Sequence, residues 1–147
     1  MKIIQKIIEN RNALAWIVMV SAISLHVFEE SMTGFLPIYN QIVLDLRKQL
    51  GFFPAPTFTF GVWLGGLIGA IILGYITTFF VIRGGKVIRI ITMVIGILMI
   101  VNAFGHFFGS IYFSMVFPGT CSSLFLLAAA LFVTINGIKG DWQIKNG

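Results

Sequence analysis

The stretch that decides the fold reads ALAWIVMVSAISLHVFEES and runs from Ala13 to Ser31. It is apolar over most of its length, as a membrane-spanning helix must be, yet it ends in a histidine and two glutamates. An ionisable side chain inside a span costs about 2.5–3.5 kcal/mol or more, so these residues need compensating partners. Glu29 and Glu30 follow His26 by three and four residues, which places all three on one helix face. We therefore expect them to converge on one proton or metal ion.

The composition of the whole chain is typical of a membrane protein. Of its 147 residues 58% are hydrophobic and 10% are charged, which is too few polar side chains to cover a soluble domain. A span needs about 20 mostly apolar residues. The stretches that qualify are residues 13–31, 60–82, 90–108 and 111–135. We predict an all-α integral membrane protein, a single domain over residues 1–147 that forms a bundle of four transmembrane helices.

The third predicted span ends in two polar residues, Asn102 and His106, which lie four apart and so share a helix face. In a bundle of hairpin-connected helices the first and third helices run in the same direction. At about 1.5 Å per residue, His26 lies ~20 Å from the start of its span and His106 lies ~24 Å from the start of its own. We expect the two histidines to lie at similar depth and to face one site.

The fourth predicted span carries Pro118 and Gly119, followed by Thr120, Cys121, Ser122 and Ser123. Proline removes a backbone donor and kinks a helix, and the glycine allows close backbone approach, so we expect a kink at the depth of the histidines. The hydroxyl groups are expected to bond backbone carbonyls there. Cys121, the single cysteine, is a candidate metal thiolate, although we expect it to serve as a small buried residue.

The connection from residue 33 to residue 59 carries a helical pattern of its own. Its apolar residues recur at helical spacing and are Ile38, Ile42, Val43, Leu46 and Leu50. This pattern predicts an interfacial helix or a partly inserted fifth helix, acting either as a lid over the site or as a surface anchor.

The second predicted span is rich in small residues. Its small-residue ridges consist of Gly61, Gly65 and Gly69, and of Gly66, Ala70 and Gly74. Such ridges let helix backbones approach closely where lipid supplies no hydrophobic drive. We predict that this helix is a packing scaffold.

These residues together carry a resemblance to a known family. The chain resembles the multi-pass membrane proteins named for an HXXEE motif, which also show N-x-x-x-H and Y-x-P-G elements. His26, Glu29 and Glu30 match the first element, Asn102 and His106 the second, and Pro118 and Gly119 the end of the third. Val116 stands where the pattern has tyrosine, and Tyr112, one turn earlier, is the candidate replacement. The resemblance implies a metal-site enzyme in the membrane.

The distribution of basic residues predicts the orientation. Eight lysines and arginines flank one side of the predicted bundle: Lys2, Lys6, Arg11, Arg83, Lys86, Arg89, Lys139 and Lys145. Only Arg47 and Lys48 flank the other. The positive-inside rule then places both termini in the cytoplasm and the polar cluster toward the opposite leaflet of the cell membrane. The net charge of +5 arises from these flanks, so it indicates anionic lipid at the cytoplasmic face and not nucleic acid. The chain is also a candidate homo-oligomer.

Two functions from different classes fit this pattern, together with a purely structural role. The first is a metal-dependent membrane hydrolase in which His26, His106 and Glu30 hold a divalent ion. The other glutamate, Glu29, is then the general base. Either glutamate is a candidate catalytic residue. Two histidines and a carboxylate suit zinc, and they also suit non-haem iron. The second is a proton or cation transporter that uses Glu29, Glu30 and His106 as a relay. The structural role is a polar network that only locks the helices together.

Overall fold

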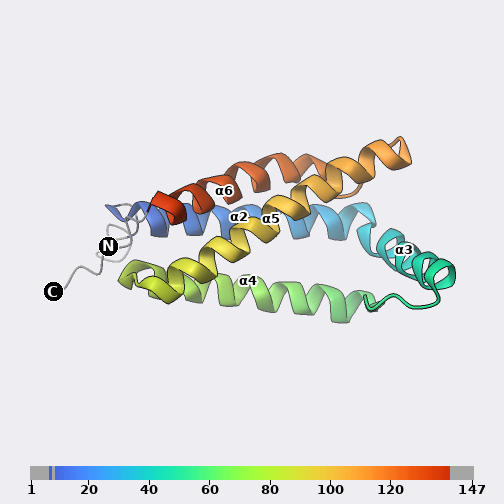
Figure 1. Ribbon diagram of the computed structural model, residues 1–147, viewed down its shortest axis with the longest axis horizontal. Coiled ribbons are helices and arrows are strands. Elements are labelled where there is room, and N and C mark those ends of the chain that lie inside the picture. The colour runs from blue at the N-terminus through green and yellow to red at the C-terminus, as the bar shows by residue number, and fades with distance from the viewer. Residues whose placement is uncertain (1–6, 8, 140–147) are drawn as a thin grey trace.

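The computed structural model describes residue 7 and residues 9–139, and it confirms the predicted all-α membrane bundle. The described helices are α2 (Arg11–Thr33), α3 (Phe35–Leu50), α4 (Phe60–Arg83), α5 (Lys86–Phe113) and α6 (Thr120–Lys139). All but α3 are long and apolar enough to cross a membrane. Figure 1 shows these four lengthwise in the molecule, with α3 at the end where α2 finishes and α4 begins. The predicted basic residues Lys2, Lys6 and Lys145 lie outside the described residues.

Both ends of α2 are set by local sequence. The Asn10 side chain accepts hydrogen bonds from the backbone N–H groups of Asn12 and Ala13, which satisfies two of the unpaired donors at the start of the helix. At the other end Gly34 adopts φ 80°, and its N–H donates to the Glu30 carbonyl. The chain therefore leaves the membrane-spanning helix directly after the polar motif and enters α3 there.

The apolar core lies between α2, α4 and α6. It contains Ala13, Ala15, Trp16, Met19, Val20, Ala22, Val81, Leu126, Ala129, Ala130 and Val133. Trp16 crosses to α4, where its indole N–H donates to the Gly74 carbonyl at 2.8 Å. The missing Cβ of Gly74 is what lets Val20 pack against that helix, because an added Cβ would lie 3.1 Å from the valine side chain.

The other glycines of α4 correct the packing prediction. A Cβ added at Gly61, Gly65, Gly66 or Gly69 would meet no atom within 4 Å. The reason is that α4 packs against α2 and makes only sparse contact with α5, so most of its small-residue surface contacts no other helix in the described part of the chain. Among the glycines of the two predicted ridges, only Gly74 lies in close contact with another helix, as was expected for all of them.

The junction between α5 and α6 also differs from the prediction. The fourth span was expected over residues 111–135 with a kink at Pro118, but α5 continues to Phe113 and α6 begins only at Thr120. Ser114 adopts a left-handed conformation with φ 52°, which ends α5. Pro118 and Gly119 therefore lie in the turn before α6 rather than inside a helix, and Tyr112 belongs to α5.

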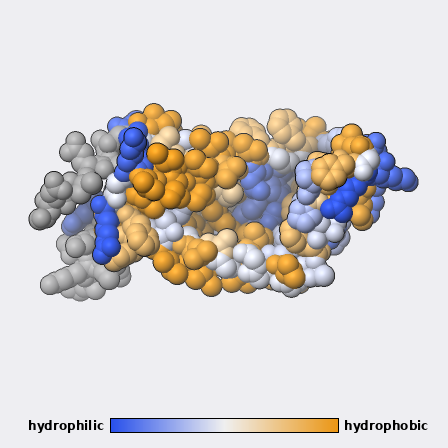
Figure 2. Space-filling model, turned by 60° about the horizontal axis from the view of Figure 1, so that its bottom comes forward, coloured by the Kyte–Doolittle hydropathy of each residue, from blue (hydrophilic) through white to orange (hydrophobic). Residues whose placement is uncertain are grey.

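The predicted helix in the first connection is confirmed as α3, and Leu36 and Val43 are its buried residues. In Figure 2 a broad apolar surface separates two ends at which hydrophilic residues gather, as expected for a protein that crosses a membrane. The same view shows a hydrophilic patch within a hollow of this apolar face. Polar groups inside the spans mark a candidate functional site.

Candidate metal centre

Three side chains meet where the C-terminal half of α2 passes the C-terminal half of α5. His26 and Glu30 come from α2 and His106 from α5, and the exposed fractions are only 4%, 5% and 3%. The Nε2 atoms of the two histidines lie 3.1 Å apart. The Oε1 atom of Glu30 lies 3.2 Å from Nε2 of His106 and 3.5 Å from Nε2 of His26. The prediction that both histidines reach one site is confirmed, and one carboxylate joins them.

The orientation of the His106 ring is fixed by a hydrogen bond of its other ring nitrogen, Nδ1. Nδ1 lies 2.6 Å from the Pro118 carbonyl oxygen. A carbonyl oxygen only accepts hydrogen bonds, so Nδ1 carries the hydrogen and donates it. In the neutral ring the lone pair is then on Nε2, the atom that faces His26 and Glu30. A metal-binding histidine is typically held in this way, by a backbone carbonyl on its other nitrogen.

The same reasoning applies to His26. Its Nδ1 lies 3.0 Å from the hydroxyl oxygen of Ser122, and that hydroxyl donates its hydrogen to the Gly119 carbonyl at 3.2 Å. Ser122 therefore accepts from Nδ1, and Nε2 of neutral His26 also presents a lone pair. With both rings neutral in these tautomers, two lone pairs and a carboxylate oxygen converge. A cation, either a metal ion or an added proton, is what such an arrangement needs.

The spacing of the three atoms fits a metal ion. Zinc holds nitrogen and oxygen ligands at about 2.0–2.2 Å, so in a tetrahedral site neighbouring ligand atoms are about 3.3 Å apart. The distances of 3.1, 3.2 and 3.5 Å between the ligand atoms bracket this value. Among the described residues, His26, Glu30 and His106 form a group whose ligand atoms all lie within 4.8 Å of one another. Three protein ligands leave a fourth position for water or substrate.

Gly119 packs against both histidine rings of the cluster. It adopts φ +88°, a conformation that side chains other than glycine rarely adopt. A Cβ at this position would lie 2.8 Å from Cε1 of His106 and 2.9 Å from Cε1 of His26. Glycine is therefore required here both for the backbone angle and for the space that the two rings occupy.

Glu29 does not share the cluster, contrary to the prediction that all three motif residues converge. Its two carboxylate oxygens accept the backbone N–H groups of Cys121 at 3.2 Å and of Ser122 at 2.6 Å. The N–H groups of Thr120 and Ser123 donate to the carbonyls of Phe117 and Gly119. All four amides in the first turn of α6 are thereby satisfied, and an anion sits at the positive end of the helix.

The remaining predicted site residues take different places. Tyr112 is 83% exposed, and Cys121 is also exposed, contrary to the prediction that it is a small buried residue, so neither side chain joins the buried cluster. Pro118 contributes through its carbonyl and Gly119 through its lack of a side chain. Asn102 lies one turn before His106, and its buried Oδ1 atom has no hydrogen-bond partner among the described residues. This oxygen is available to a water molecule or a bound group.

Hydroxyl groups of the turn and of α6 bond backbone carbonyls as predicted, although Pro118 lies outside a helix and no kink frees those carbonyls. Ser122 and Ser123 both donate to the Gly119 carbonyl, and Thr120 donates to the carbonyl of His106. Ser110 of α5, which the sequence did not single out, accepts the N–H of Phe117, and its hydroxyl lies 2.7 Å from that of Thr120 and 3.0 Å from the His106 carbonyl oxygen, to one of which it donates. These bonds fix the turn that carries Pro118 and Gly119 against the histidine.

Two contacts of the histidines escaped prediction. The sequence predicts a bond from Ser122 to a backbone carbonyl, whereas its bond to His26 depends on the α2–α6 packing. Phe35, the first residue of α3, places its ring centroid 5.4 Å from that of His106. The only advance signal for Phe35 was its position directly after Gly34, since a helix that begins there must start beside the motif.

No family model, no curated protein and no solved structure matches this chain. The resemblance to HXXEE-motif proteins therefore stays a prediction that rests on three short motifs.

Proposed function

We propose that this protein is a membrane-embedded, metal-dependent enzyme, a hydrolase of the HXXEE-motif type, whose ion is held by His26, Glu30 and His106. The observation that supports this most strongly is the convergence of two imidazole Nε2 atoms and one carboxylate oxygen within 3.1–3.5 Å, in a buried setting. Two histidines and one carboxylate with an open fourth position are typical of catalytic zinc sites. The same set also suits non-haem iron.

A bound divalent ion would polarise a substrate carbonyl or phosphoryl oxygen and lower the pKa of a coordinated water. The protein groups then have separate tasks. Pro118 and Ser122 hold the two Nδ1–H groups and so keep both Nε2 lone pairs directed at the ion. The buried Oδ1 of Asn102, one turn before His106, has no hydrogen-bond partner among the described residues and is proposed to accept a hydrogen bond from water. Glu29 is proposed as a positioning residue, because both its oxygens are engaged by α6.

Metal content is the direct test of this function. We expect detergent-purified protein to hold about one zinc or iron ion per chain, and Glu30→Gln to lose it, because the isosteric amide is a poor ligand. Gly105→Ala is the matched control, since Gly105 is exposed and an added Cβ there meets no atom within 4 Å. Hydrolysis of a chromogenic ester should disappear with chelator and in Glu30→Gln. A folded, metal-free wild-type protein would contradict the proposal.

A proton relay is the second candidate, and the Nε2 to Nε2 distance of 3.1 Å favours it because one added proton would also join the two rings. In that case the purified protein is metal-free and its thermal unfolding is insensitive to chelator. A pH gradient across liposomes should then drive proton flux that Glu30→Gln abolishes. A network that serves packing alone would give neither metal nor flux.

We propose further that the protein resides in the cell membrane with both termini in the cytoplasm. Arg83, Lys86, Arg89 and Lys139 lie at the ends of α4, α5 and α6 away from α3, a position suited to anionic lipid headgroups. In a Cys121→Ser background, Gln41→Cys should react with an impermeant thiol reagent from outside the cell and Lys86→Cys should not. The opposite labelling pattern would invert the orientation.

A further inference from the structure

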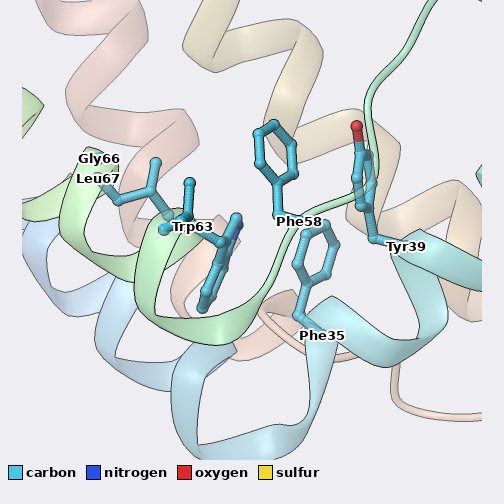
Figure 3. A pocket seen from close by; sticks show the side chains of 7 residues that line it. Phe35, Tyr39, Phe58, Trp63, Gly66 and Leu67 are labelled. Atoms are coloured by element: carbon cyan, nitrogen blue, oxygen red, sulfur yellow. The ribbon is translucent and has the colours of Figure 1, made fainter.

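An apolar pocket of about 370 Å³ lies beside the metal centre, between α3, the loop before α4 and the first turns of α4. We call it the aromatic pocket, and it is lined by Phe35, Tyr39, Phe58, Trp63, Gly66 and Leu67, together with Val62. Figure 3 shows the four aromatic side chains around one space, with Trp63 and Leu67 on the α4 side. None of the described residues that line it is charged.

Phe35 is the wall that the pocket shares with the metal centre. Its ring centroid lies 5.4 Å from that of His106 and 6.1 Å from that of Trp63. The Phe35 ring therefore lines the pocket and also contacts His106. A molecule that occupies the pocket is one side chain away from the proposed ion.

The loop wall of the pocket is held in place by side chains of α3. The amide of Asn40 donates to the Phe58 carbonyl at 2.9 Å and accepts the Phe58 N–H at 3.0 Å. The Tyr39 hydroxyl donates to the Pro56 carbonyl, and Arg47 donates to the carbonyls of Phe53 and Ala55. A segment without regular secondary structure is thus fixed by five hydrogen bonds, so the pocket is built before any ligand binds.

The pocket opens among residues that would face lipid. Val62, on its wall, is 66% exposed, and Ile68 on the same helix is 46% exposed. Gly66 contributes open space, because an added Cβ would meet no atom within 4 Å. A ligand can therefore enter sideways from the bilayer, and a charged group inside the pocket would lack a partner.

We propose that the aromatic pocket binds the hydrocarbon chain of a lipid substrate and places the polar head of that lipid at the metal centre. This inference rests on the proposed enzyme function and names its substrate class. The pocket volume, at the low end of the range of about 300–1,000 Å³ for small-molecule sites, suits a single chain rather than a bulky ring system. The polar head would take the fourth position beside His106, past the Phe35 ring.

Photocrosslinking with palmitic acid that carries a diazirine and an alkyne tests the pocket. We expect label on peptides containing Phe35, Phe58 or Trp63, and we expect excess unlabelled palmitate to compete with it. Gly66→Phe fills the pocket and should reduce competed labelling by about tenfold or more, equivalent to ~1.4 kcal/mol. Gly65→Phe is the matched control on the same helix, since Gly65 is exposed and does not line the pocket. Equal labelling of the two variants would overturn the proposal.

Cobalt(II) loaded in place of the native metal tests where the polar head lies. Palmitate should change the visible absorption of cobalt in wild type and in Gly65→Phe, but not in Gly66→Phe, and hexadecane should leave all three unchanged. Competed labelling with an unchanged cobalt spectrum would overturn the placement of the head. Metal content separates the two proposals: a wild-type protein that holds no metal contradicts the enzyme, whereas metal-loaded protein without competed labelling contradicts the lipid pocket alone.

Discussion

Glu29 and Glu30 are neighbours in the sequence, yet they serve two different regions of the molecule. Glu30 is buried and lies within 3.5 Å of an imidazole nitrogen from each of α2 and α5. Glu29 is half-buried and accepts two backbone N–H groups at the start of α6. One step along a helix rotates the side chain by about 100°, so consecutive carboxylates reach different neighbours. The same type of side chain is thus a candidate metal ligand at Glu30 and a helix cap at Glu29.

Replacing Glu30 should produce the largest effect on metal binding. Glu30→Gln removes the carboxylate ligand, and because loss of an outer-shell partner already costs 10–100-fold in metal affinity, we expect a loss of roughly 100-fold or more. The stability of the metal-free protein should change little, since the amide can donate a hydrogen bond to an Nε2 lone pair. Competition with a chromophoric chelator measures the affinity. Unchanged affinity would remove Glu30 from the ligand set.

Gly119→Ala should have the next largest effect because it disturbs the candidate metal centre through the turn before α6. The added Cβ would lie within 2.9 Å of both imidazole rings. The alanine would also have to adopt the left-handed backbone conformation of Gly119, which costs about 1–3 kcal/mol. We expect a metal affinity lower by about 10–100-fold. Gly105→Ala, one residue from His106, should leave affinity unchanged and stabilise α5 by about 0.5–1 kcal/mol. Equal behaviour of the two variants in metal titration would show that the rings do not depend on Gly119.

Ser122→Ala sharpens the comparison because Ser122 touches both regions. Its N–H donates to Glu29 and survives the substitution, whereas its hydroxyl bond to His26 is lost. We expect a drop in metal affinity of about tenfold. Ser123→Ala is the control, since that hydroxyl also donates to Gly119 and contacts neither histidine in the described hydrogen bonds. A comparable drop in Ser123→Ala would assign the effect to the turn and not to His26.

Replacing Glu29 should have the smallest effect on metal affinity and a clear effect on stability. Glu29→Ala leaves two amides of α6 without acceptors, and loss of a helix cap costs about 0.5–2 kcal/mol. Glu29→Gln should cost less, because its carbonyl still accepts one N–H. Denaturant unfolding in detergent with chelator measures both. If Glu29→Gln lost metal as completely as Glu30→Gln, the separation of the two carboxylates would be wrong.

Much of the candidate site could be predicted from periodicity and direction alone. The spacing of His26 and Glu30 places them on one face of any helix, and two helices that run in the same direction bring His106 to their depth. Glu29 could not be placed in this way, because helical spacing gives a face but not the neighbour on it. Its partner exists only because α6 begins at Thr120.

The residue at which α6 begins could not be predicted from composition either. The apolar run from Ile111 to Phe117 reads as continuous membrane helix, although Ser114 breaks it with a left-handed backbone. The aromatic pocket was equally inaccessible to sequence analysis. It depends on the direction in which α3 leaves Gly34 and on the hydrogen bonds that hold the following loop, and both are tertiary features.

X-ray absorption spectroscopy of the metal-loaded protein tests the central claim most directly. At the zinc edge we expect two imidazole ligands and oxygen ligands, with metal–ligand distances of about 2.0–2.2 Å. Glu30→Gln should lose this signature, and Glu29→Gln should keep it. A sulfur ligand from Cys121, or the same spectrum in wild type and Glu30→Gln, would contradict a centre built from His26, Glu30 and His106.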